Sequence, residues 1–272
     1  MYNIKNLLNN PNVKVIAEQG NVKILEHQQD MSVSPAQAAT EYFAAQMNIK
    51  KRQAFVKLEN SSFTISAGAM QWTIGNVQAS SDVKGVGDFL GKALKGAVTK
   101  ESTVKPKYSG TGYLMLEPTY KHLIMENIED WSGGIVLEDG MFLGCDGTVN
   151  QEIVARSNLS SAVLGNEGLF NLKLTGNGMC ILESAVPRQE LIEIELENDQ
   201  IRIDGSYAVC WSGSLDFSVE KSTKSLIGSA VSGEGFVNVY KGTGKILMSP
   251  LVSKGFARMQ SQISGSINNF LK

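Results

Sequence analysis

The residue types that most often perform catalysis or bind metals are scarce in this sequence. Among 272 residues, histidine occurs only at His27 and His122. A metal-dependent β-barrel oxygenase needs two histidines and a carboxylate close together, usually beginning with H-x-D or H-x-E. His27 is followed by two glutamines and His122 by Leu-Ile, so neither fits this pattern. We interpret both histidines as surface or turn residues.

The three cysteines, Cys145, Cys180 and Cys210, do not form a metal-binding or disulfide pattern. Their number is odd and no C-x-x-C pair occurs, which is typical of buried, reduced thiols in a cytosolic protein. The spacing also excludes a Cys₂His₂ zinc site. Cys145 and Cys210 each lie five residues after a glycine at the same place in two similar segments, which favours a packing position over a nucleophile. We therefore expect no catalytic, cofactor-binding or metal-binding residue.

Three glutamates, Glu59, Glu126 and Glu197, are each followed by asparagine. If the segments that contain them packed about a pseudo-threefold axis, their carboxylates could coordinate a cation such as calcium. Alternatively, Glu-Asn simply opens the turn of a hairpin, and we favour this interpretation. The sequence does not say whether the three side chains converge.

Several Gly-x-Gly elements resemble phosphate-binding loops. A dinucleotide fingerprint needs G-x-G-x-x-G between a strand and a helix, and a P-loop ends in Gly-Lys-Ser/Thr. Here each element precedes a strand, and Gly242-Thr243-Gly244-Lys245 is followed by Ile246, so the hydroxyl that would hold magnesium is missing. We assign these glycines to turns or bulges.

Basic residues gather in two places. Residues 83–100 have apolar residues at helical spacing, and the polar side carries Lys84, Lys92, Lys95 and Lys100. Such a helix suits an anionic membrane surface, but its four glycines weaken it in isolation, so we favour docking on the protein or on a partner. The compact cluster Lys50-Lys51-Arg52 is interpreted as a solvated cap at a helix end.

The composition indicates a globular protein. Hydrophobic residues make up 42% and charged residues 19%, and the formal net charge is −2, without the basic excess of a nucleic-acid-binding protein. No window approaches a membrane-spanning length, and asparagines interrupt residues 1–11 before a signal peptide can form. We expect a cytoplasmic protein that does not bind nucleic acid.

The elements that would position these residues form an internal repeat. Residues 58–65 and 196–203 share an apolar residue, Glu-Asn, a polar turn and an alternating run, which predicts a β-hairpin, and a third copy starts at Met125. Each copy then has glycines at matching places, first Gly68, Gly140 and Gly205, then Gly75, Gly147 and Gly213. A Ser/Thr-Gly-x-Gly element follows in each, at 109–112, 175–178 and 232–235.

These repeats predict a mainly β protein, a barrel or sandwich with a few short helices. We expect N-terminal strands and a helix over residues 1–52, one compact β domain of three repeats over 53–250 (53–120, 121–186 and 187–250), and a helical tail over 251–272. Helices are predicted near 36–47, with Ser34 as N-cap, near 83–98 and near 256–270. The runs 113–116 and 179–182, apolar on both faces, predict central strands.

The order of motifs resembles the altered-inheritance-of-mitochondria family of mitochondrial biogenesis proteins (its twenty-fourth member). The residues that carry the likeness include 68–70, 75–77, the glycine-spaced insert 85–96, 138–143, 168–176 and 242–244. The resemblance implies a fold like the tryptophan RNA-binding attenuation protein, with short double-stranded β-helix units. It also implies a homo-oligomeric ring such as a trimer, and no catalytic motif. The absence of an Arg-rich presequence favours a bacterial member of unknown function.

We therefore expect a non-catalytic, oligomeric scaffold or binding protein without a cofactor. Residues 83–100 are the candidate contact with a protein partner or a membrane periphery. The alternative is a protein that binds a small molecule or a cation between β repeats or subunits.

Overall fold

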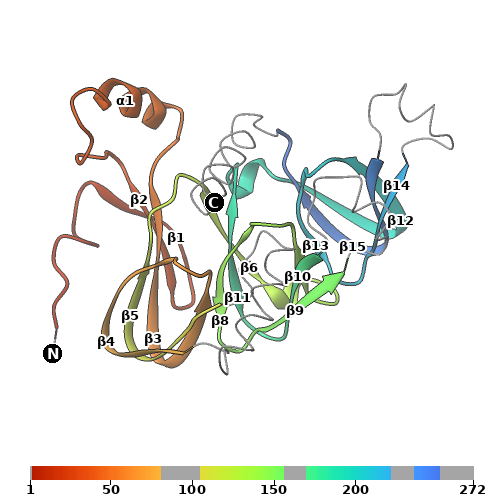
Figure 1. The fold of residues 1–272 in the computed structure, drawn as a ribbon, viewed down its shortest axis with the longest axis horizontal. Coiled ribbons are helices and arrows are strands. Elements are labelled where there is room, and N and C mark those ends of the chain that lie inside the picture. The colour runs from red at the N-terminus through yellow and green to blue at the C-terminus, as the bar shows by residue number, and fades with distance from the viewer. Residues whose placement is uncertain (1, 81–104, 156–169, 222–235, 252–272) are drawn as a thin grey trace, which may run out of the picture.

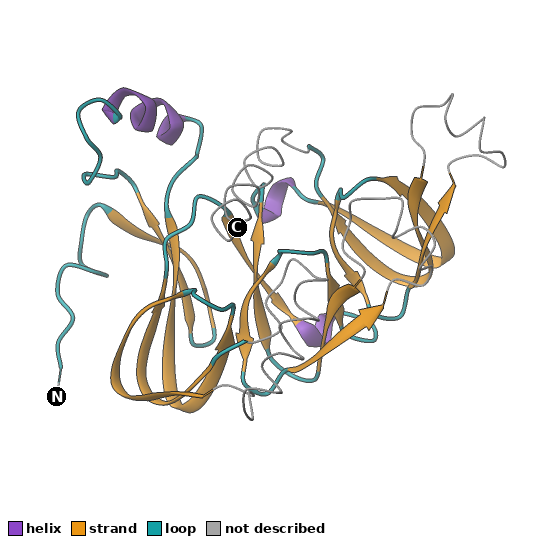
Figure 2. Cartoon of the chain, in the orientation of Figure 1, coloured by secondary structure: helices purple, strands orange, loops and turns teal. Residues whose placement is uncertain are grey.

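The computed structural model describes residues 2–80, 105–155, 170–221 and 236–251, and this part of the chain is mainly β (Figures 1 and 2). It contains one α-helix, α1 (Ala38–Gln46), and two 3₁₀ helices, η1 (Ile128–Asp130) and η2 (Arg188–Glu190). The strands are β1 (Val13–Gln19), β2 (Val22–His27), β3 (Arg52–Ile65), β4 (Met70–Ser80), β5 (Lys107–Leu116), β6 (His122–Asn127), β7 (Ile135–Leu137), β8 (Phe142–Asp146), β9 (Asn150–Ala155), β10 (Phe170–Thr175), β11 (Met179–Ser184), β12 (Ile192–Asp204), β13 (Ala208–Ser212), β14 (Asp216–Lys221) and β15 (Phe236–Met248). The expected mainly β class is confirmed.

The strands form two curled sheets. The first has the order β1-β2-β3-β8-β11-β6, with β5 also paired to β3 and β4 added outside β5. The second has the order β12-β15-β13-β7-β10-β9, with β14 paired to β15. All pairs are antiparallel, and the curled sheets succeed one another along the long axis of the molecule (Figure 1). β5 and β11 each have strand neighbours on both sides, which confirms the two predicted central strands.

Two of the three segments that were predicted to be hairpins are bulged single strands, and in the third, which starts at Met125, β6 and β7 belong to different sheets. Residues 58–65 lie within β3, whose pairing to β5 shifts register between Glu59 and Ser61, where Asn60 has a φ of 51°. The same arrangement occurs in β12, where Asn198 has a φ of 52°. One left-handed residue adds a bulge and bends the strand without reversing its direction. The hairpin prediction was wrong because asparagine in this conformation is common to bulges and turns.

The glycines opposite these bulges are required by close contact between strands. Gly112 pairs with Leu58 on one side and Gly75 on the other, and a Cβ on it would lie 2.0 Å from the Ile74 carbonyl oxygen. In the second sheet Gly242 and Gly244 take the matching places opposite β12. The predicted element at 232–235 lies outside the described residues. The close strand contacts at Gly112 and Gly244 fit the role in bulges that was expected for these elements.

The apolar core follows the inner faces of the curled sheets. One cluster fills the first unit with residues such as Ile24, Val56 and Leu114, and a second in the middle includes Trp131 and Leu137. A third is built around the contacting rings of Trp211, Phe217 and Tyr240. Because successive residues of a strand face opposite sides, alternate residues remain for the outer faces.

The N-terminal region is continuous with the first sheet. β2 pairs with the first half of β3, so Val22 lies opposite Val56. The helix predicted over 36–47 is confirmed, but it begins at Ala38 after Gln37 and no side chain caps it, because the Ser34 hydroxyl donates to the Gln37 side chain instead. α1 contains no buried residue. The helices predicted near 83–98 and 256–270 lie outside the described residues.

Candidate functional site

A polar cleft of about 540 Å³ separates α1 from the ends of β2 and β3. Residues 38, 41, 42, 45 and 46 of the helix form one wall, and the segments 27–33 and 48–51 form the others together with Tyr120. The helical positions lie three to four residues apart and therefore share one face. The cleft thus joins the N-terminal region to the start of the main β structure.

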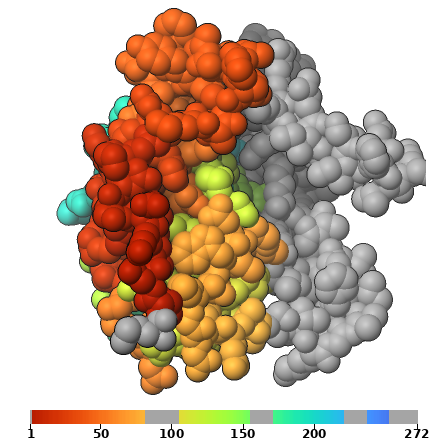
Figure 3. All heavy atoms as spheres, turned by 90° about the vertical axis from the view of Figure 1, so that its left-hand side faces the viewer, coloured from red at the N-terminus to blue at the C-terminus, as the bar shows by residue number. Residues whose placement is uncertain are grey.

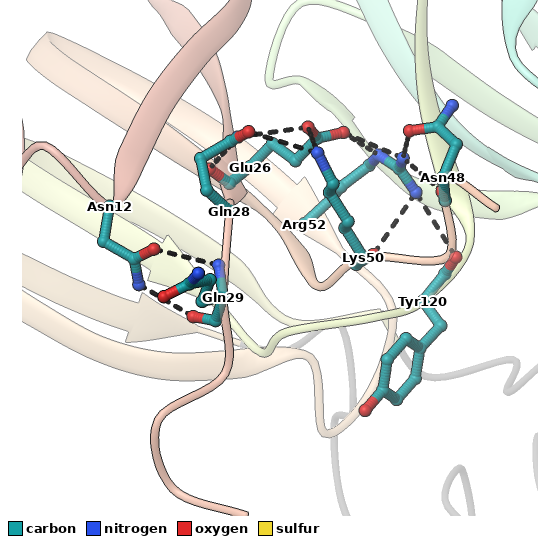
Figure 4. Close-up of polar contacts among 8 residues, drawn as sticks. All are labelled: Asn12, Glu26, Gln28, Gln29, Asn48, Lys50, Arg52 and Tyr120. Carbon is teal, nitrogen blue, oxygen red and sulfur yellow. Dashed lines mark hydrogen bonds and ion pairs between the residues drawn. The ribbon is translucent and has the colours of Figure 1, made fainter. Parts of the chain in front are cut away.

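Behind the lining residues Asn48, Lys50 and Tyr120 lies one buried arginine, Arg52, which is only 1% exposed (Figure 4). Its Nη2 lies 2.8 Å from Glu26 Oε2, and its Nε donates to the same oxygen at 3.0 Å. Its remaining donors reach the Asn48 side chain and carbonyl and the carbonyls of Lys50 and Tyr120. A fixed fork of N–H donors suits such convergence, so Arg52 joins three chain segments.

Glu26, the partner of Arg52, is also held by its neighbours. Burial alone would raise the pKa of Glu26, but a hydrogen bond from Gln28 and the charge and hydrogen bond of Arg52 outweigh it and lower the pKa. Lys50 Nζ lies 3.5 Å from Glu26 Oε1 and donates to Gln28 at 3.1 Å. Glu26 is therefore an ionised structural group and a poor proton acceptor.

A second set of contacts crosses the cleft itself. Lys51 forms an ion pair with Asp30 and lies 5.5 Å from the centre of the Tyr120 ring. The Tyr120 hydroxyl donates to Glu41 of α1, with distances of 3.2 and 3.1 Å to the two carboxylate oxygens. Hydrogen bonds from Lys51 and Ser32 lower the pKa of Asp30 to about 2. The Tyr120–Glu41 contact links α1 to the body across the cleft.

The chemistry that this cleft offers is recognition by hydrogen bonds and ring contact. Lys50 and Lys51 already face carboxylates, and Asp30 is held ionised. The amide side chains of Gln29 and Gln46 and the ring of Tyr42 also line it. Such a lining suits a neutral, polar ligand better than a strongly charged one.

The histidines, which were expected at the surface or in turns, lie at strand ends and are half-buried. His27 ends β2, and its Nε2 lies 2.7 Å from Gln53 Oε1. His122 begins β6, where burial and the positive charge of Arg52 lower its pKa to about 4. Both positions follow from strand pairing that links distant segments, which local sequence does not reveal.

The three cysteines are free and buried. Cys145 and Cys180 lie opposite each other on β8 and β11, and Cys210 lies on β13 opposite Leu137. Burial, followed by the nearby Asp146, raises the pKa of Cys145 to about 12, and burial raises those of the other two well above the ordinary value. These thiols sit in the core as small apolar side chains.

The three glutamates differ in environment. Glu59 and Glu197 are exposed, whereas Glu126 is buried, accepts hydrogen bonds from Trp131 Nε1 at 3.3 Å and Arg188 Nε at 2.7 Å, and forms an ion pair with the same arginine. Among the described residues, no group of three His, Cys, Asp or Glu side chains is arranged to hold a metal ion. The described part of the chain thus gives no support to a three-carboxylate cation site.

The basic cluster at 50–52 was misread as a solvated cap. Arg52 is a buried strand residue, and the Lys50 and Lys51 side chains are only 21% and 30% exposed and form ion pairs. The signal that could have revealed this is the apolar run that starts at Ala54, two residues after Arg52, and places Arg52 at a strand end. The predicted basic helix over 83–100 lies outside the described residues, and no described helix is long and apolar enough to span a membrane.

Two bacterial proteins are similar to this chain. An uncharacterized protein of Streptococcus pyogenes serotype M6 is 28% identical over 203 residues, which cover 72% of this chain and 79% of that protein. A crystal structure of a Streptococcus pyogenes protein matches with a TM-score of 0.57 and 23% identity, and the match covers 82% of this chain and 95% of that one. The second similarity concerns the fold alone.

The family model described as mitochondrial biogenesis AIM24 matches residues 44–251, from the end of α1 to just beyond β15. β1, β2 and most of α1, including one wall of the cleft, precede this match. The family model spans well over half of the sequence, so this chain belongs to the mitochondrial biogenesis AIM24 family.

Proposed function

We propose that the protein is a non-catalytic, oligomeric β-rich scaffold or binding protein of the bacterial cytosol. The observation that carries the proposal is the edge strand β4, which pairs only with β5 among the described strands. Its eleven residues, Met70–Ser80, include no charged side chain, and each is exposed or half-buried. A long, uncharged edge presents unpaired main-chain groups and is a template for pairing with another chain.

The edge strand β12, at the opposite end of the molecule, differs from β4 in its charge. β12 is also an edge, paired only with β15 in the described part of the chain, but its outward residues include Glu193, Glu195, Glu197 and Asp199. Acidic side chains of this kind oppose pairing of two identical edges. The proposed contact between copies therefore uses β4. Two β4 edges paired with each other would give a two-fold dimer, and in a closed ring such as a trimer β4 would instead meet a different surface of the next copy.

Native mass spectrometry of the gently purified full chain tests this proposal. We expect an integer multiple of 29.4 kDa, and we expect Thr73→Lys with Gln78→Lys to dissociate it, because charges on the edge oppose pairing. Gln200→Lys on β12 is the matched control and should leave the assembly intact. A monomer at all micromolar concentrations would overturn the proposal, as would an oligomer indifferent to the β4 charges.

A second candidate function, binding of a small molecule, is favoured by the cleft beside α1. Its volume of about 540 Å³ suits a small neutral ligand. A thermal-shift screen with neutral sugars and amides should raise the melting temperature of the parent chain but not of Tyr42→Ser with Gln46→Ala. A broad screen without any shift in the parent chain would exclude this second function.

A further inference from the structure

The outer face of the first sheet carries an apolar groove that residues 2–9, here named the N-terminal strap, cover only in part. The groove floor consists of Leu25, Phe55, Tyr113 and Met115, with Trp72 at its side. Phe55 and Tyr113 stack with centroids 4.8 Å apart, and Trp72 lies 6.0 Å from Phe55. These residues alternate along their strands with the inner core residues, so the first sheet is apolar on both faces.

The strap lies on this groove through side chains alone. Ile4 and Leu7 pack against the floor, and the ring of Tyr2 meets Tyr113 edge-on at 6.1 Å. Among the described residues, the main-chain hydrogen bonds of the strap stay local, such as the Asn10 N–H to the Leu7 carbonyl, and none joins it to the sheet. Figure 3 shows this segment running across the face beside β4. A segment held in this way can leave the sheet without breaking a main-chain hydrogen bond to it.

The strap also underfills the groove. One open pocket of about 300 Å³ is lined by residues 2–4 and 7–9 with Phe55 and Tyr113, and another of about 460 Å³ continues past Leu8 toward the β1–β2 turn. Both share Phe55, Tyr113 and Leu8 as lining. The second is bordered by the ion pairs Lys23–Glu18 and Lys57–Glu59. An apolar centre surrounded by charged and amide side chains is typical of surfaces that bind peptides.

The strap has a fixed pivot. The Asn12 side chain donates to the Gln29 carbonyl at 2.7 Å and accepts from the Gln29 N–H at 2.9 Å, as Figure 4 shows. The chain beyond Asn12 enters β1, whereas residues before it leave the sheet. The strap can therefore leave the groove while β1 stays in place. It also precedes the region that the family model matches.

We propose that this groove is a docking site for an extended peptide of another protein, with aliphatic and aromatic side chains spaced like Tyr2, Ile4 and Leu7, and that the strap is its intramolecular competitor. The sequence that occupies the groove defines the chemistry it accepts, and the unfilled cavities leave room for larger side chains. An attached competitor acts at an effective concentration in the millimolar range, so it lowers the apparent affinity of a free peptide.

The test uses a fluorescein-labelled peptide with the sequence of residues 2–9 and fluorescence anisotropy. The peptide should bind a variant that lacks residues 2–9, and should bind the full chain at least tenfold more weakly. Full-length Ile4→Asp with Leu7→Asp opens the groove without shortening the chain and guards against a deletion that does not fold. A peptide with the same two aspartates is the matched control and should not bind.

Two results would overturn the proposal. One is absence of peptide binding to both opened variants while their circular dichroism remains that of the full chain. The other is an oligomer of the full chain that becomes monomeric when residues 2–9 are deleted, since the strap of a second copy would then occupy the groove. Because the oligomer of the proposed function depends on β4, charges on β4 and deletion of the strap separate the two proposals.

Discussion

The strap and α1 both lie in the N-terminal fifty residues, carry similar apolar side chains and use them in opposite ways. Ile4 and Leu7 of the strap pack onto a sheet and help to leave Phe55 only 3% exposed. Tyr42 and Phe43 of α1 are 61% and 67% exposed. The difference lies in the surface opposite, which is an apolar face of β-strands in one case and a polar cleft in the other. Whether an apolar side chain is buried therefore depends on the surface that it faces as well as on its residue type.

We therefore expect the strap and the residues that anchor it to contribute more to the stability of the fold than α1 does. Burial of apolar area contributes about 25 cal/mol per Å², so a covered side chain stabilises the fold and an exposed one does not.

Replacement of Arg52 by methionine should have the largest effect, a loss of about 3–5 kcal/mol in the free energy of unfolding, because Glu26 is left charged and buried. Urea denaturation followed by circular dichroism measures this loss. Lys50→Met is the matched control and should cost less than about 1 kcal/mol, because the Lys50–Glu26 pair is longer and more exposed. Equal losses for the two variants would contradict the role given to Arg52.

Ile4→Asp with Leu7→Asp should destabilise the fold by about 1–3 kcal/mol, because two half-buried aliphatic side chains lose their contacts with the groove floor. Equilibrium unfolding in urea gives this value. Lys5→Asp, an exposed position between them, is the control and should change the free energy of unfolding by less than about 0.5 kcal/mol. If the control matches the double variant, charge and not burial is responsible.

The ion pair between Asp30 and Lys51 should make stability depend on pH. The folded pKa of Asp30, about 2, lies below its ordinary value of 3.8, so the stabilisation is complete above about pH 4 and is lost as the pH falls toward 2. Lys51→Met should move the Asp30 pKa, followed by carboxyl NMR, upward toward 3.8. The variant should also show a smaller difference in the free energy of unfolding between pH 5 and pH 3. An Asp30 pKa that does not change in Lys51→Met would contradict the ion pair.

Tyr42→Ser with Phe43→Ser should have the smallest effect on folding, within about 0.5 kcal/mol, because neither side chain of α1 is buried. The melting temperature should therefore stay close to that of the parent chain. A drop of several degrees would show that α1 packs against another surface in solution, and the contrast with the strap would then fail.

Local patterns predicted much of the fold. The helix near 36–47, the central strands and the glycines at close strand contacts all depend on residue type and short spacing, which local sequence contains. The bulges at Asn60 and Asn198 were predicted as turns because the left-handed conformation is the same in both. The register of the opposite strand distinguishes them, and that register depends on residues about fifty positions away.

The cleft and the groove could not be predicted because both depend on contacts between distant segments. Arg52 meets a carboxylate 26 residues earlier and a carbonyl 68 residues later, so its run of basic residues looked like a solvated cap. No contact of residues 2–9 with the sheet was predicted from the sequence. The structure shows that Ile4 and Leu7 pack on the face of the first sheet where Phe55 and Tyr113 stack.

The three buried thiols make the protein its own reporter of unfolding. A maleimide or a disulfide reagent needs an accessible thiolate, and the native fold withholds both access and ionisation at all three cysteines. Cys145 and Cys180 belong to the first sheet and Cys210 to the second. All three side chains lie in the middle apolar cluster, so pulse labelling read by peptide mass spectrometry can time the opening of the core that the two sheets share.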